Sequence, residues 1–161
     1  ENGCEIQNSC CAQSGIMLRL RLVKTPEAED PNAVEEGGML HGTAVLKYLV
    51  EPWAHTCRFV GGDSYFASVA ATRVMNNIGF GFIGVIKNAT REYPMAYLQA
   101  LELSNRGDYE GVVTLGENGQ ATMMAFVWMD RERRYFISNT SSLAAGSPYT
   151  RSRWRQIAPV E

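Results

Sequence analysis

Residues 56–86 read TCRFVGGDSYFASVAATRVMNNIGFGFIGVI and predict a strand, a helix and a second strand in succession. The β-branched and aromatic residues within 56–60 favour a short strand. Ser68 is a good N-cap for a helix that ends near Ile78, and Gly79 can adopt the left-handed conformation that often follows a helix. The apolar residues 80–86 then predict a strand that is buried on both faces. Such a unit indicates two parallel strands with a helix across one face of their sheet.

Further elements are predicted on both sides of this unit. Residues 4–11 and 16–23 predict strands, and the second one alternates leucine with arginine, which predicts one charged, solvent-exposed face. Residues 42–50 predict a helix that Pro52 ends, with Thr43 as a cap. A further helix is expected at 94–103, and residues 109–115, 123–129 and 135–139 predict an antiparallel meander separated by turns.

The order of these elements predicts an α/β fold, in which a mixed sheet with flanking helices is followed by an antiparallel β meander. We expect the core to occupy residues 1–106 and to include an acidic loop at 25–38. We expect the β-meander insertion, with a basic C-terminal segment, to occupy residues 107–161. The chain begins at Glu1 without a recognisable leader, and we interpret it as a fragment of a larger protein.

Composition restricts the function classes. The 161 residues are 45% hydrophobic and 20% charged, as in an ordinary globular protein, and no apolar run is long enough to cross a membrane. The net charge of -2 argues against attraction of nucleic acid by the chain as a whole. The charge is uneven, however: residues 1–63 carry 5 basic and 9 acidic side chains, and residues 64–161 carry 10 basic and 8 acidic ones.

The cysteines and histidines do not form a recognisable site. Cys4, Cys10, Cys11 and Cys57 lack the CxxC spacing of structural zinc sites, so we expect free thiols in a reducing compartment. Either His41 or His55 could join an Asp and a Ser in a hydrolase triad, but the G-x-S-x-G elbow is absent.

Asp63 is the strongest candidate for chemistry. It follows a predicted strand, and ligands of open α/β sheets bind at the carboxyl ends of strands. Gly61 and Gly62 leave room for a bulky polyanion, and a carboxylate there can hold Mg²⁺. The structural alternative is that Asp63 caps the following helix. A single carboxylate does not make a two-metal site.

The Asp63 motif resembles that of the piggyBac transposase family. The resemblance rests on Asp63, the aromatic pair that follows it and Ser68, then a helix, a glycine-containing strand and a loop that ends in Arg91, Glu92 and Pro94. It implies a ribonuclease H-like fold with a β insertion and a DDE/DDD-type site. Enzymes of this type use three acidic residues and two Mg²⁺ ions to cut and join DNA strands.

The resemblance assigns the three acidic positions unequally. Asp63 matches the second position, and Cys11 stands where the first Asp is expected. The third position lies beyond the end of this chain, and the surroundings of Glu161 do not match it. Because a thiol is a poor ligand for a hard cation, we expect the chain alone to bind Mg²⁺ weakly and not to cut DNA. The chain therefore resembles an enzyme but lacks two of its three acidic residues.

The resemblance also implies a partner. Lys87 and Arg91 match the family's basic loop and would contact DNA phosphates, although exposed loops are often simply solvated. Arg131, Arg133 and Arg134 form a basic turn, and Arg151, Arg153 and Arg155 would share one face of an extended segment, with Trp154 on the other. The implied partner is transposon-end DNA, with a homodimer as the oligomer to consider, no membrane, and a nuclear location. The alternative is a co-opted structural or protein-interaction module without DNA contact.

Overall fold

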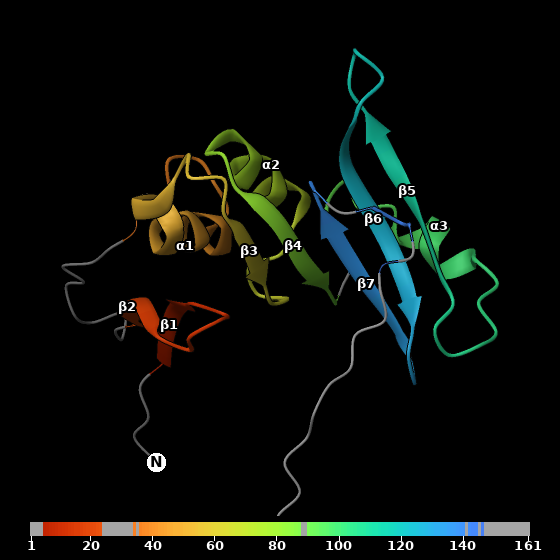
Figure 1. Ribbon diagram of the computed structural model, residues 1–161, viewed down its shortest axis with the longest axis horizontal. Coiled ribbons are helices and arrows are strands. Elements are labelled where there is room, and N and C mark those ends of the chain that lie inside the picture. Colours follow the sequence, from red (N-terminus) through yellow and green to blue (C-terminus); the bar gives the residue numbers. More distant parts are fainter. Residues whose placement is uncertain are drawn as a thin grey trace, which may run out of the picture.

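The computed structural model describes residues 5–23, 34, 36–87, 90–140, 142–144 and 146. Figure 1 shows strands and helices alternating in the first part of the chain and strands dominating the second part. The elements are β1 (Glu5–Cys10), β2 (Met17–Val23), α1 (His41–Val50), the 3-10 helix η1 (Glu51–Trp53), β3 (Phe59–Gly62), α2 (Val69–Asn77), β4 (Gly81–Ile86), α3 (Met95–Ala100), β5 (Tyr109–Leu115), β6 (Ala121–Met129) and β7 (Arg133–Ser138).

The central β3–α2–β4 unit has the predicted form. β3 pairs in parallel with β4, so that Gly62 lies opposite Gly84. Ser68 is the N-cap of α2 and its hydroxyl accepts a hydrogen bond of 3.0 Å from the amide of Ala71. Gly79 follows the helix with a φ of 76°, which glycine adopts without steric cost. Local sequence signals therefore place both ends of this helix correctly.

The larger sheet has the strand order β3-β4-β7-β6-β5. β7 runs antiparallel to β4, and β5, β6 and β7 form the predicted antiparallel meander. The sheet is therefore mixed, and the predicted α/β class is confirmed. The meander continues the sheet of β3 and β4 rather than forming a sheet of its own, and the division of the chain at residue 107 stays a prediction.

Strands β1 and β2 form a separate antiparallel hairpin that packs against α1 (Figure 1). The predicted orientation of this hairpin is wrong. Arg21 is only 7% exposed, whereas Leu18, Leu20 and Leu22 are 46–50% exposed. The arginines face inward because Arg19 donates to the carbonyl of Tyr48 and Arg21 donates to Gln7. Because the arginines find polar partners on the inner side, β2 buries its arginine face and exposes its leucine face, the opposite of what hydrophobicity alone predicts.

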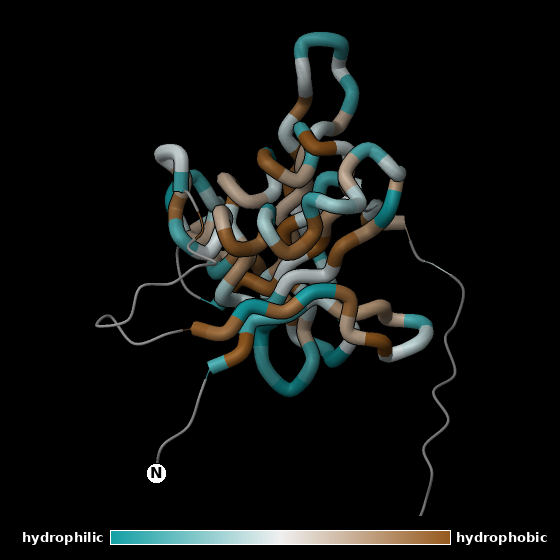
Figure 2. Tube along the Cα trace, turned by 90° about the vertical axis from the view of Figure 1, so that its left-hand side faces the viewer, coloured by the Kyte–Doolittle hydropathy of each residue, from teal (hydrophilic) through white to brown (hydrophobic). Residues whose placement is uncertain are grey.

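The core lies between the helices and the larger sheet. Its largest fully buried side chains include Phe82, Leu49, Met75, Leu98 and Ile137. Figure 2 shows hydrophobic stretches concentrated in the body of the molecule and a hydrophilic turn between β5 and β6 that projects from it. β4 is not buried on both faces throughout, because Ile83 is 40% exposed. This part of the sheet is therefore covered on one face only.

The observed ends of α1 and α3 differ in part from the predicted ones. The N-cap of α1 is Leu40, which offers no side-chain cap, and Thr43 is buried within the helix, so the predicted Thr43 cap is wrong. The helix does end at Pro52 as predicted: α1 stops at Val50, and the chain continues into η1, which contains Pro52. Helix α3 ends at Ala100, where Arg133 donates hydrogen bonds of 2.6 and 2.7 Å to the carbonyls of Gln99 and Leu101.

Among the described residues, no helix has the length and apolar character needed to cross a membrane.

Candidate functional site

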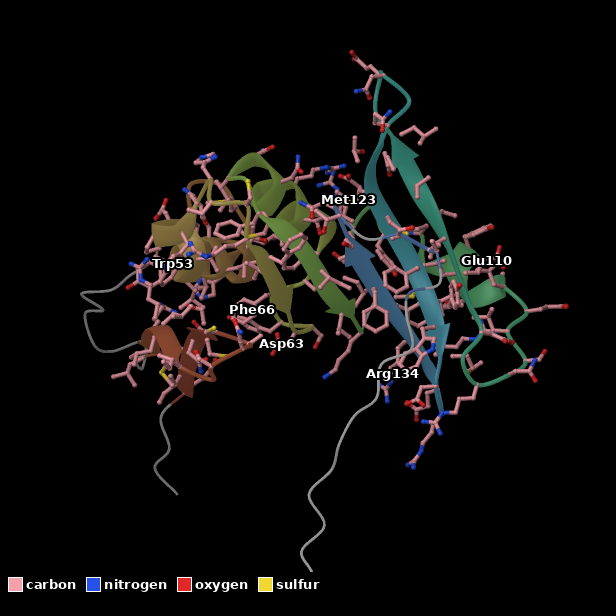
Figure 3. All side chains as sticks on the ribbon, in the orientation of Figure 1. Trp53, Asp63, Phe66, Glu110, Met123 and Arg134 are labelled. Carbon is pink, nitrogen blue, oxygen red and sulfur yellow. The ribbon has the colours of Figure 1, made fainter. Side chains whose placement is uncertain are left out.

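The candidate site is the edge of the larger sheet at which β3 and β4 end. Asp63 follows β3 directly, and Lys87 follows β4 directly. Because these strands are parallel, both residues lie at the same edge. β7 begins there too, since it is antiparallel to β4 and Tyr135 lies opposite Ile86, which places Arg134 beside Lys87. Figure 3 shows Asp63 and Arg134 toward this lower edge, and Met123 toward the opposite one.

Hydrogen bonds within its own turn fix the Asp63 carboxylate. Its Oδ1 accepts a hydrogen bond of 2.9 Å from the amide of Tyr65, and its carbonyl accepts from the amides of Phe66 and Ala67. Ser68, and not Asp63, caps α2, so the alternative reading of Asp63 as the helix cap is wrong. Asp63 is exposed, although its Oδ1 is held within the turn.

The glycines around Asp63 serve two purposes. A Cβ on Gly61 would have no atom within 4 Å, so this position leaves open space as the sequence predicts. A Cβ on Gly62 would come within 2.9 Å of the Phe82 ring, and a Cβ on Gly84 within 2.5 Å of the Ala67 Cβ. These two glycines are therefore needed for the close packing of the Asp63 turn on β4.

The hairpin that carries Cys11 touches both the Asp63 turn and α1. The hairpin meets that turn through Gln7, whose Nε2 is 3.3 Å from the Tyr65 hydroxyl. Two residues later, Ser9 donates to the carbonyl of Leu49, near the carboxyl end of α1. The Tyr65 carbonyl instead abuts Gly42, near the start of α1, about 10 Å from Leu49 along the helix axis.

The structure therefore brings Gln7 to the Asp63 turn. Cys11 as the counterpart of the first Asp stays a prediction from the resemblance. Hydrogen bonds from Ser14 lower the pKa of the partly buried Cys11 thiol, but a thiol remains a poor ligand for Mg²⁺.

The predicted basic residues fall into two groups. Lys87 and Arg91 are exposed. Arg91 is followed by Glu92, whose φ of 66° is unusual for a residue other than glycine. Glu92 forms an ion pair of 2.6 Å with Arg73, which lowers the pKa of the Glu92 carboxyl. Arg151, Arg153 and Arg155 lie outside the described residues.

The sequence alone does not assign three residues, Arg134, Gln7 and Arg21, to this region. Arg134 reaches the edge because of strand register, which the sequence does not specify. Gln7 reaches the Asp63 turn through its contact with the Tyr65 hydroxyl, and Arg21 donates a hydrogen bond of 2.9 Å to Gln7. Tyr65, by contrast, is part of the aromatic pair that follows Asp63, so the sequence does place it next to Asp63.

The donor set does not make a two-metal site. Within the part of the chain that the structure describes, no three His, Cys, Asp or Glu side chains come together in a way that could hold a metal ion. Asp63 contributes one carboxylate, and its Oδ1 already accepts the Tyr65 amide. DDE-type transposases generally use divalent metal ions. The residues described here would supply one ligand to such an ion.

A cavity of about 230 Å³ lies on the helix-covered face of the sheet. Val112, Ala125 and Ile137 form part of its floor, and Arg73 and Asn77 belong to its rim. Asp63, Lys87 and Arg134 are not among its lining residues. This cavity is therefore separate from the edge that carries the candidate site.

Comparisons with known proteins identify the family. A family model described as Transposase IS4, of the DDE type, matches residues 1–160. The cryo-EM structure of a piggyBac transposase synaptic complex with hairpin DNA is similar to 90% of this chain, with a TM-score of 0.68 and 15% sequence identity. The chain covers 28% of that transposase chain. No significant match was found among curated proteins. The chain therefore belongs to the Transposase IS4 family of DDE-type transposases, and its fold is that of part of a piggyBac-type transposase.

Proposed function

We propose that this chain contributes the DNA-contacting edge of a transposase catalytic domain. One observation carries the proposal: Asp63, Lys87 and Arg134 lie along one edge of the larger sheet, at the ends of three neighbouring strands. The two cations on this edge suit contacts with the phosphates of a DNA backbone. Arg91 follows Lys87 in the next loop and adds a further exposed cation.

The test is binding of fluorescent duplex DNA by the chain over a salt series, with transposon-end DNA compared with a random duplex. Lys87→Ala and Arg134→Ala should each weaken binding and reduce the slope of log affinity against log salt by about one. Arg58→Ala is the matched control, since Arg58 precedes β3 at the opposite edge and the charge change is the same. Equal effects of the three variants would contradict binding at this edge.

We further propose that the chain alone does not cleave DNA and holds Mg²⁺ weakly, because Asp63 is one carboxylate where two-metal chemistry needs several. Supercoiled plasmid incubated with the chain and Mg²⁺ or Mn²⁺ should stay intact. Nicking that is lost in Asp63→Ala would overturn this part of the proposal.

A second candidate function, a protein-interaction module, is favoured by the outer face of the hairpin. Ile6, Leu18, Leu20 and Leu22 are each 46–50% exposed on one face, and exposed apolar groups of this kind often mark interaction surfaces. Absence of DNA binding at low salt, together with self-association that Leu20→Glu abolishes, would favour this function. The latter result would also identify the homodimer.

A nuclear location accompanies the DNA-binding proposal. Imaging of the tagged chain in cells would test it, and exclusion from the nucleus would argue for the interaction module.

A further inference from the structure

We propose that the Tyr65 hydroxyl is a hydrogen-bond donor for a phosphate oxygen of DNA bound beside Asp63. The inference deepens the proposed function and rests on it. It assigns a neutral side chain to phosphate recognition at an edge where sequence reasoning identified charged residues.

Gln7 is only 6% exposed, and its side-chain amide has a defined orientation. Arg21 donates a hydrogen bond of 2.9 Å to its Oε1. Because a guanidinium can only donate, this bond fixes which end of the Gln7 amide is the oxygen. The Nε2 group of Gln7 is then directed toward Glu5 and Tyr65, each at 3.3 Å.

The Tyr65 hydroxyl can both accept and donate a hydrogen bond. It accepts the hydrogen bond from Gln7 Nε2, which can only donate. A phenol that accepts one bond keeps its own proton for another partner. The structure gives this proton no acceptor among the described residues, and Tyr65 is 51% exposed, so the proton can be donated to a ligand from solvent.

Several contacts also hold Tyr65 in place next to Asp63. Its amide donates to Asp63 Oδ1, its carbonyl abuts Gly42, and its ring packs edge-on against Phe66 with 5.0 Å between the ring centroids. The donor is therefore pre-positioned, and little conformational entropy is lost when a ligand binds. Phosphate oxygens are strong acceptors, and tyrosine hydroxyls are among the groups that contact them in DNA complexes.

The experiment measures fluorescence anisotropy of a labelled duplex with the full chain over a salt series. Tyr65→Phe removes the hydroxyl but keeps the ring and the backbone amide that binds Asp63. It should weaken binding by about threefold to tenfold, the usual worth of one hydrogen bond. The salt slope should stay unchanged, because a hydroxyl displaces no counterion. Tyr97→Phe is the matched control, since Tyr97 is 50% exposed on α3.

A second variant tests the relay. Gln7→Leu removes the amide that donates a hydrogen bond to the Tyr65 hydroxyl oxygen. This variant should also weaken DNA binding without changing the salt slope. Far-ultraviolet circular dichroism spectra of Tyr65→Phe and Tyr97→Phe should coincide with that of the wild-type chain. Binding is measured well below the Tm of each variant, so that a difference in affinity reports on contact with DNA.

The possible outcomes separate the two proposals. If Lys87→Ala weakens binding but Tyr65→Phe behaves like Tyr97→Phe, the Tyr65 assignment is overturned and the DNA-contacting edge stands. If Tyr65→Phe changes the salt slope as Lys87→Ala does, its effect is not that of a neutral donor and the assignment is again overturned. If the unchanged chain binds no duplex at low salt, both proposals fail.

Discussion

The guanidinium carbon of Arg19 lies 3.6 Å from the centroid of the Tyr48 ring, and the same side chain donates a hydrogen bond to the Tyr48 carbonyl. This contact joins the β1–β2 hairpin to α1. Together with the bond between Arg21 and Gln7 it holds the charged face of β2 inward. Polar contacts of Arg19, Ser9 and Gln7 thus join the hairpin to α1 and to the Asp63 turn.

Arg19→Ala should therefore lower the free energy of unfolding by about 1–3 kcal/mol, as it removes a cation–π contact and a hydrogen bond. Urea unfolding followed by circular dichroism would measure the change. Leu20→Thr is the control from the outer face and should change stability by less than about 0.5 kcal/mol. A larger loss in Leu20→Thr than in Arg19→Ala would show that the hairpin packs through its leucines.

The hairpin also marks the limit of what the sequence can predict. The β3–α2–β4 unit follows from local signals, because Ser68 and Gly79 determine the ends of α2 through their own backbone preferences. The face that β2 buries depends on Tyr48 and Gln7, which are distant in sequence from Arg19 and Arg21. Asp63 was identifiable from its place after a strand, whereas Arg134 joins it only through the pairing of β7 with β4.

Ser68→Ala should lower the free energy of unfolding by about 1 kcal/mol, since the hydrogen bond to the Ala71 amide at the start of α2 is lost. Thermal melts would reveal the loss as a lower Tm. Ser68→Asn retains a side-chain acceptor and should recover most of the stability. If Ser68→Asn were as unstable as Ser68→Ala, the cap would not be the source of the effect.

Gly84→Ala should destabilise the fold by about 1–3 kcal/mol, because the new Cβ would lie 2.5 Å from the Ala67 Cβ and would push the Asp63 turn away from β4. Gly61→Ala is the matched control on the neighbouring strand, where a Cβ meets no atom within 4 Å. Chemical denaturation of the two variants would compare them. Similar stabilities would indicate that the Asp63 turn does not pack closely on β4.

The ion pair between Arg73 and Glu92 predicts a pH dependence. The Glu92 pKa is lowered in the folded chain, first by its hydrogen bond with Arg73, so its contribution to stability is present above the unfolded pKa. It is lost as the pH falls through the folded pKa. The stability difference between the unchanged chain and Arg73→Gln should therefore shrink between about pH 6 and about pH 3.

Because both side chains of this pair are about half exposed, the effect is small and needs paired denaturation curves at each pH. Arg58→Gln is the control for the change in net charge, since the Arg58 guanidinium donates to the Thr56 hydroxyl. A stability difference for Arg73→Gln that grows on acidification would contradict the assignment.

Tyr93→Phe should cost about 1–2 kcal/mol of stability, because the buried Tyr93 hydroxyl donates a hydrogen bond of 3.0 Å to the carbonyl of Phe136. Burial raises the Tyr93 pKa above its ordinary value, so the hydroxyl keeps its proton and remains a donor at neutral pH. Tyr97→Phe, at an exposed position of α3, should leave stability unchanged. Equal unfolding curves for the two variants would contradict the structural role of this hydroxyl. A loss of stability in Tyr93→Phe but not in Tyr97→Phe would support a role for the Tyr93 hydroxyl in anchoring the loop to the sheet. Arg91 lies in this loop, two residues before Tyr93.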